Sequence, residues 1–139
     1  MSVDRIFLDA NILFSMAYGS PSLEHLWELA REKRCVLLAS NYVIEEARRN
    51  LPSGEQIKRL EIFLSVVHIV PEVDPEIPCP IELPHKDWPV LLAAMSAKAD
   101  YLLTGDMMHF GKYLRQTISG VNICLPRDYL THLHKKRVR

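Results

Sequence analysis

The sequence predicts an α/β fold, a three-layer α/β/α domain around a central, mostly parallel sheet of five strands. Two patterns support this prediction. Short runs of consecutive apolar residues, typical of strands covered on both faces, alternate along the chain with segments whose apolar residues recur every three or four positions. Such alternation is typical of β-α-β units with parallel strands. The 139 residues also suit one domain, residues 1–139.

The chain begins with a strand and two helices. The apolar run Ile6-Phe7-Leu8 predicts a buried strand that ends at Asp9 and leads into a short helix over 12–18. Ser20-Pro21 is a capping residue followed by proline, which is the order found at helix starts. The apolar face of this second helix puts Trp27 in the core.

A second strand is predicted over 35–39, where a short apolar run is bounded by polar residues. Residues 42–51 predict a third helix, which Pro52 breaks. A fourth helix begins at Ser53, because the residues after it have the spacing of a capping box. It leads into a third strand, the β-branched run 66–70.

The second half of the chain opens with a proline-rich, acidic stretch from Pro71 to Pro84, which predicts a long loop. Regular structure then resumes with a nearly all-apolar helix. The remaining predicted elements are a helix over 88–98, a strand over 101–104, a short helix over 108–114, a fifth strand over 121–125 and a last helix over 129–135.

Composition excludes several classes of protein. The 17 basic and 17 acidic side chains cancel, so the net charge does not indicate a polyanion partner. No apolar run approaches the roughly 20 residues of a membrane-spanning helix, so no membrane association is expected. The N-terminus lacks the order of a signal peptide, and the three cysteines are odd in number and far apart. We therefore expect a cytoplasmic protein with reduced thiols.

Four acids are predicted to converge at the carboxyl edge of the sheet. Asp9 ends the first strand, and Asp106 follows the fourth. A crossover helix runs antiparallel to the strands beside it. The length of about 11 helical residues is close to the length of five strand residues, so the helix and the strand between Asp87 and Asp106 run the same distance in opposite directions. Asp87 is therefore expected to lie level with Asp106. Glu46 lies in the second turn of the third helix, within side-chain reach of the same edge.

Each acid, taken alone, also suits a purely structural role. Asp9 and Asp87 suit helix caps, Glu46 suits a solvated helix face, and Asp106 after a glycine suits a turn. Together, however, four crowded carboxylates would raise one another's pKa unless a cation neutralised them. Because no paired His or Cys accompanies them at ligand spacing, they favour Mg²⁺ or Mn²⁺ over zinc. Such ions support phosphoryl chemistry by lowering the pKa of a bound water.

These residues resemble the PIN-domain ribonucleases, whose pattern is a strand ending in Asp, a mid-chain Glu on a helix, and an Asp-helix-strand-Asp block. The block from Asp87 to Asp106 is the most specific part, and the match spans nearly the whole chain. The resemblance implies a PIN-like domain. It also implies catalytic, metal-binding acids and two polar helpers, namely Asp9, Glu46, Asp87 and Asp106 with Asn11 and Thr104.

Two positions depart from a simple match. Glu45 adjoins Glu46, and the spacing from Ser40 favours Glu46. The family often shows a further acid before a phenylalanine, where this chain has His109-Phe110, so the number of metal ions stays open.

The resemblance to PIN-domain ribonucleases implies a metal-dependent endoribonuclease that hydrolyses RNA with a metal-activated water. The small size is similar to the toxin half of prokaryotic toxin–antitoxin pairs, which implies an antitoxin partner; a homodimer is also expected. The alternative is a non-catalytic PIN-like module that binds RNA or protein, against which the presence of all four acids argues. Phosphate-loop, dinucleotide-binding and zinc-protease motifs are absent from the sequence.

The basic C-terminal tail is a separate candidate site. Its side chains can contact RNA phosphates, although a solvated terminus is the alternative. The residues concerned are Lys135, Lys136, Arg137 and Arg139.

Overall fold

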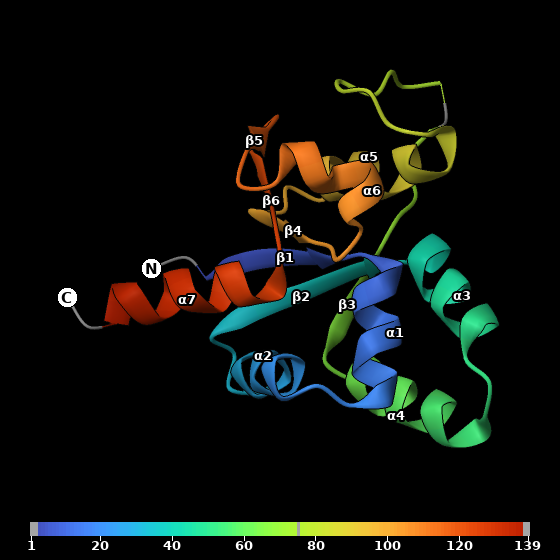
Figure 1. Ribbon diagram of the computed structural model, residues 1–139, viewed down its shortest axis with the longest axis vertical. Helices are drawn as coiled ribbons and strands as arrows, with labels where there is room; N and C mark the ends of the chain where they lie inside the picture. The colour runs from blue at the N-terminus through green and yellow to red at the C-terminus, as the bar shows by residue number, and fades with distance from the viewer. Residues whose placement is uncertain (1–2, 75, 138–139) are drawn as a thin grey trace.

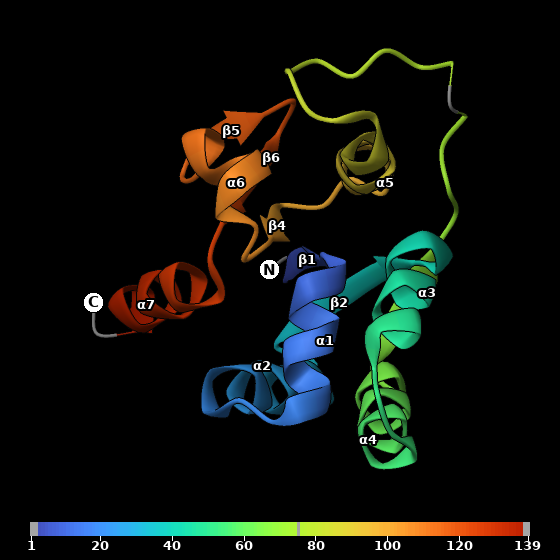
Figure 2. The same ribbon diagram turned by 45° about the vertical axis from the view of Figure 1, so that its right-hand side comes forward.

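The computed structural model describes residues 3–74 and 76–137, and within them six strands form one sheet (Figures 1 and 2). The strand order is β3-β2-β1-β4-β6-β5, and all neighbours are parallel except β5 and β6. The strands are β1 (Asp4–Leu8), β2 (Cys35–Ser40), β3 (Val67–Val70), β4 (Tyr101–Leu103), β5 (Thr117–Ile118) and β6 (Val121–Cys124).

The prediction of five strands was wrong, because β5 pairs with β6 as an additional antiparallel strand. Ser119 and Gly120 join the two strands with φ angles of 50° and 87°. Two central residues with positive φ are typical of a tight hairpin turn. A two-residue strand is too short to show any alternation of apolar and polar residues, so the sequence pattern did not reveal it.

The helices form the outer layers of the predicted α/β/α arrangement. In both views α1, α2 and α4 lie on one side of the sheet and α5 and α6 on the other, while α3 packs against both α1 and α5 (Figures 1 and 2). Short 3₁₀ turns precede α5 and follow α6, at His85–Asp87 and Gly111–Tyr113. The helices are α1 (Ala10–Tyr18), α2 (Pro21–Arg31), α3 (Asn41–Asn50), α4 (Gly54–Leu64), α5 (Trp88–Ser96), α6 (Met107–Phe110) and α7 (Pro126–Arg137).

The apolar runs of β1 and α5 lie in the core. Ile6, Phe7 and Leu8 of β1 are completely buried, because β1 lies in the middle of the sheet with helices over both faces. Five consecutive residues of α5, from Val90 to Ala94, are also buried. The site described below is therefore built on rigid elements.

Two local predictions need correction. Trp27 packs against the core but is only half-buried, with the Arg31 guanidinium 4.8 Å from the centre of its ring. The buried residues of α2 are its leucines, Leu23, Leu26 and Leu29. Ser53 precedes α4 as predicted, but its hydroxyl contacts the Gln56 side chain and makes no capping bond to a backbone N–H.

The proline-rich loop and the free cysteines agree with the sequence. Residues 71–74 and 76–84 contain no helix or strand, as the prolines predicted. All three cysteines are free thiols. Over the residues that the structure describes, no helix combines the length and the apolar character needed to cross a bilayer.

Candidate functional site

The site lies where the direction of strand progression reverses. From β1 the chain moves outward to β2 and β3, then returns to place β4 on the other side of β1. Ligands of open α/β sheets bind outside the carboxyl ends of the strands at such a switch point. Leu8 of β1 pairs with Leu103 of β4, so the residues that follow them, Asp9 and Thr104, lie level at this edge.

Asp9 is held by three hydrogen bonds. One carboxylate oxygen, Oδ2, accepts from Thr104 Oγ1 at 2.8 Å and from Asn11 Nδ2 at 3.1 Å. The other, Oδ1, accepts from the Ala10 N–H at 2.8 Å, so Asp9 also caps α1. The cap interpretation and the site interpretation are thus compatible, because each uses a different oxygen.

Asn11 ties together the two turns that carry Asp9 and Asp106. Its Oδ1 accepts from the Gly105 N–H at 2.7 Å, and the Asp106 N–H donates to Thr104 Oγ1 at 3.1 Å. A Cβ at position 105 would lie 3.3 Å from Asn11 Oδ1, so glycine allows this close approach. The two predicted polar helpers therefore join β1 to β4 at the carboxyl edge.

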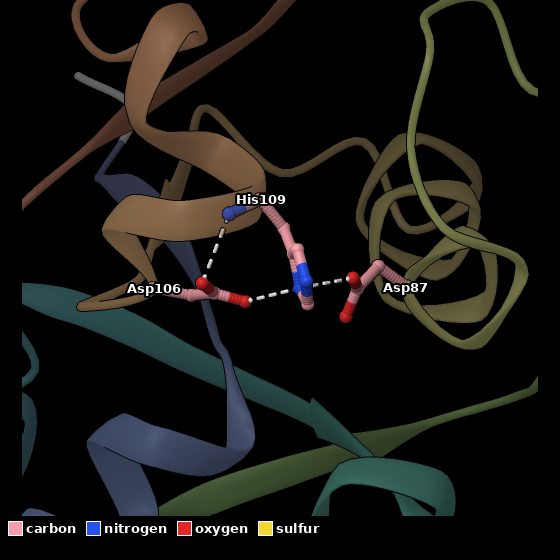
Figure 3. Close-up of side chains that lie close together, drawn as sticks. All are labelled: Asp87, Asp106 and His109. Carbon is pink, nitrogen blue, oxygen red and sulfur yellow. Dashed lines mark hydrogen bonds and ion pairs between the residues drawn. The ribbon is translucent and has the colours of Figure 1, made fainter.

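Asp87, Asp106 and His109 form a compact cluster (Figure 3). His109 Nδ1 lies 2.8 Å from Asp87 Oδ2 and 2.9 Å from Asp106 Oδ2, but neither contact has the alignment of a hydrogen bond. Asp106 caps α6 with its other oxygen, which accepts from the His109 N–H at 3.0 Å. Asp87 precedes α5 but makes no capping bond, so the cap interpretation fails for this residue.

Glu46 faces the site and Glu45 does not. Glu46 is half-buried and lines a cleft of about 300 Å³, whereas Glu45 is exposed and pairs with Arg48 at 2.7 Å. All four predicted acids line this one cleft, with further lining from Asn11, Phe14, Asn50 and Lys86.

Burial raises the pKa of two acids of the cleft, Asp9 and Asp87, and the charges of neighbouring carboxylates add to this shift. Burial raises the pKa of Asp9 to about 6, an effect that the hydrogen bonds from Thr104 and Ala10 oppose and the charge of Asp87 increases. Burial also raises the pKa of Asp87, and the nearby His109 and Lys86 side chains oppose this shift. A bound cation would stabilise the charged carboxylates and so oppose this rise in their pKa values.

The residues present fit a divalent ion. Asp87 is only 8% exposed, yet its Oδ2 has no hydrogen-bond partner among the residues that the structure describes, which is costly for a carboxylate unless a cation neutralises it. Asp87, Asp106 and His109 each offer one ligand atom within 4.8 Å of the others. Asp9 and Glu46 are not members of this cluster and line the same cleft beside it.

Two residues of the site were not predicted from the sequence. His109 is three positions after Asp106, a spacing that puts two side chains on the same side of a helix, but it was noted only as a departure from the family pattern. Lys86 lines the cleft beside Asp87, and no feature of the sequence indicated it.

The basic tail begins in the last turn of α7. The backbone of residues 135–137 belongs to α7. The side chains of Lys135, Lys136 and Arg137 and the whole of Arg139 lie outside the described residues. Their contact with RNA stays a prediction.

The fold and the site define an α/β protein with a mostly parallel sheet and an acidic cleft at the switch point of that sheet. The family described as "PIN domain" matches residues 5–108, and the chain therefore belongs to the PIN-domain family. This result confirms the resemblance seen in the sequence. The members of this family are generally nucleases.

Solved structures share the fold. VapBC2 from Rickettsia felis, bound to a DNA fragment from its promoter, aligns with a TM-score of 0.57 and 19% identity over 86% of this chain and 96% of that one. PAE2754 from Pyrobaculum aerophilum aligns with a TM-score of 0.61 and 18% identity over 97% and 99% of the two chains. No curated protein matches the sequence.

Proposed function

We propose that this PIN-domain protein is a metal-dependent endoribonuclease that hydrolyses phosphodiester bonds in RNA. The observation that supports it most is the single cleft lined by Asp9, Glu46, Asp87 and Asp106. Membership of a family of nucleases supports the same reaction class.

Asp9, Asp87 and Asp106, with Glu46 across the cleft, would hold one or more Mg²⁺ or Mn²⁺ ions. Such an ion, when bound, lowers the pKa of water and stabilises the charge that develops on the phosphate. The chain itself fixes the positions of these acids. Thr104 and Asn11 hold the Asp9 carboxylate in one orientation, and the bond from Gly105 to Asn11 keeps the two turns together. Lys86 on the cleft wall offers a positive charge to an RNA phosphate.

The test is cleavage of labelled RNA by the purified protein with Mg²⁺, with Mn²⁺ and with a chelator. We expect cleavage only with metal, and a loss of about 100-fold or more in Asp9→Asn, which removes charge from the cleft at nearly constant shape. Circular dichroism checks that the variant is folded. RNA binding without cleavage under every condition would favour the non-catalytic module instead.

We also propose an antitoxin partner. The similarity in fold to VapBC2 supports it, and the acidic cleft offers an electrostatic mode of inhibition in which a basic side chain of the partner displaces the ion. Co-expression with the product of an adjacent short reading frame should suppress cleavage, and neutralising the basic residues of that partner should restore it. The homodimer stays a prediction, for which sedimentation equilibrium gives the mass in solution.

A further inference from the structure

We propose that His109 is a nitrogen ligand of the ion in this cleft, and that its imidazole makes the site select a first-row transition ion such as Mn²⁺ over Mg²⁺. The inference rests on the metal-binding part of the proposed function. It does not depend on RNA cleavage.

The spacing of the three side chains supports this role. Adjacent ligand atoms of an octahedral ion with bonds of about 2.1 Å lie about 3 Å apart. His109 Nδ1 lies 2.8 Å from Asp87 Oδ2 and 2.9 Å from Asp106 Oδ2, which is close to that spacing on both sides (Figure 3). Both distances from the ring nitrogen are therefore close to what a shared ion requires, and the three residues each offer a ligand atom within 4.8 Å of the others.

The hydrogen bonding of the ring supports it further. His109 Nδ1 and Asp87 Oδ2 are both buried, and neither has a hydrogen-bond partner among the described residues. A ring N–H that served only as a counter-ion would be expected to point at one of the carboxylates. If the lone pair of His109 Nδ1 binds the same ion as those carboxylates, the ring nitrogen needs no such alignment with their oxygens.

The backbone holds His109 in this place. Asp106 accepts from the His109 N–H with Oδ1, and its other oxygen faces the ring. The two side chains are three residues apart in one turn of α6, so the cap of the helix also sets the positions of the two ligands. The His109 side chain is 21% exposed, and its two neighbours in the cluster, Asp87 and Asp106, both line the cleft.

Replacing an oxygen by an imidazole nitrogen changes which ion the site favours. Mg²⁺ prefers oxygen ligands and keeps several waters, whereas first-row transition ions accept imidazole readily. A donor set of two carboxylates and one imidazole therefore favours Mn²⁺ relative to Mg²⁺, and the favoured ion follows from one residue of α6.

The experiment measures the bound ion and not its activity. The full chain is loaded with Mn²⁺ after chelation and dialysis, and electron spin-echo modulation reports whether a ¹⁴N nucleus couples to the ion. We expect the coupling in the wild type and in His85→Gln, a control from the 3₁₀ turn next to Asp87, where the His85 ring stacks on Trp88 at 4.2 Å. We expect none in His109→Asp or His109→Gln.

A competition titration gives the selectivity. The ratio of Mn²⁺ to Mg²⁺ affinity should fall about tenfold or more in His109→Asp, which keeps a metal-binding side chain but removes the nitrogen. If the His109 variants do not fold, wild-type protein labelled with ¹⁵N-histidine shows whether a histidine supplies the coupled nitrogen, because the modulation must then change to that of ¹⁵N. His109 is the histidine that lies in the cluster with Asp87 and Asp106.

Three results would overturn the inference. Mn²⁺ bound in the wild type without nitrogen coupling would remove His109 from the ligands and leave the proposed function standing. Tighter Mn²⁺ binding in His109→Gln would identify the ring as a competing counter-ion. No Mn²⁺ binding at all would overturn this inference together with the metal-binding part of the proposed function.

Discussion

Single residues in this protein carry two tasks at once, and the separation of those tasks onto different atoms explains the site. Asp9 and Asp106 each use one oxygen as a helix cap and present the other to the site. Replacing either residue therefore removes the helix cap and alters the site at the same time. Stability and function can be separated only by measuring both.

Asp9 gives a prediction about pH. Its folded-state pKa is raised to about 6 from 3.8, so the metal-free folded protein binds this proton more tightly than the unfolded chain does. The free energy of unfolding should then fall as pH rises from about 4 to about 6. In chelator at pH 7, Asp9→Asn should be more stable than the wild type, by about 1 to 3 kcal/mol.

Urea unfolding at several pH values checks this prediction. The advantage of Asp9→Asn should disappear below about pH 4, where the wild-type carboxyl is protonated in both states. A variant less stable than the wild type at pH 7 would show that the lost hydrogen bonds outweigh the burial of charge.

The pair Glu45 and Glu46 gives a prediction about activity. Glu46 lines the cleft and Glu45 pairs with Arg48 on the surface. Glu46→Gln should reduce RNA cleavage by about tenfold or more, while Glu45→Gln should stay within about twofold of the wild type, since exposed ion pairs contribute little. Comparable losses in the two variants would contradict this assignment of the glutamates.

At the scale of elements, the two ends of β1 have different roles. The carboxyl end delivers Asp9 to the cleft, and the amino end anchors α7, because Tyr129 donates a hydrogen bond to Asp4 Oδ2 at 2.8 Å. Tyr129 is 1% exposed and packs edge-on against Tyr101 of β4. This end of the sheet contributes stability without contributing to the site.

Tyr129→Phe tests this division between the ends of β1. Loss of the hydrogen bond to Asp4 should lower the free energy of unfolding by about 1 kcal/mol, measured by urea titration. The rate of RNA cleavage should not change under conditions where both proteins are folded. A large loss of activity in a folded variant would show that the two ends are coupled.

At the scale of the whole molecule, the cleft makes the stability of the fold depend on the ion. Buried, mutually repelling carboxylates destabilise the metal-free protein, and an ion that binds only the folded state stabilises it by mass action. The ion that fits the site best should therefore protect the fold most.

Thermal and urea unfolding with added ions test this linkage. At a concentration of Mn²⁺ 100 times its dissociation constant, the free energy of unfolding should rise by about 2.7 kcal/mol. Asp106→Asn should lose most of this gain, whereas Glu45→Gln, which alters an exposed acid outside the cleft, should keep it. An identical gain in all three proteins would indicate ion binding elsewhere.

The sequence by itself determined the layers of the fold and the meeting of the four acids. Apolar runs such as Ile6-Phe7-Leu8 are typical of strands inside a covered parallel sheet, and the carboxyl ends of parallel strands meet at one edge. Asp9, Glu46, Asp87 and Asp106 could therefore be brought together by counting residues in helices and strands.

Only the tertiary structure decided the rest, because it depends on contacts that leave no periodic pattern. The strand β5 is defined by its pairing with β6, and Trp27 packs against the core while staying half-buried. The approach of the His109 ring to Asp87 joins residues from different elements to within 2.8 Å. Such an approach is set by how α5 and α6 pack on the sheet, and local spacing in the sequence does not encode it.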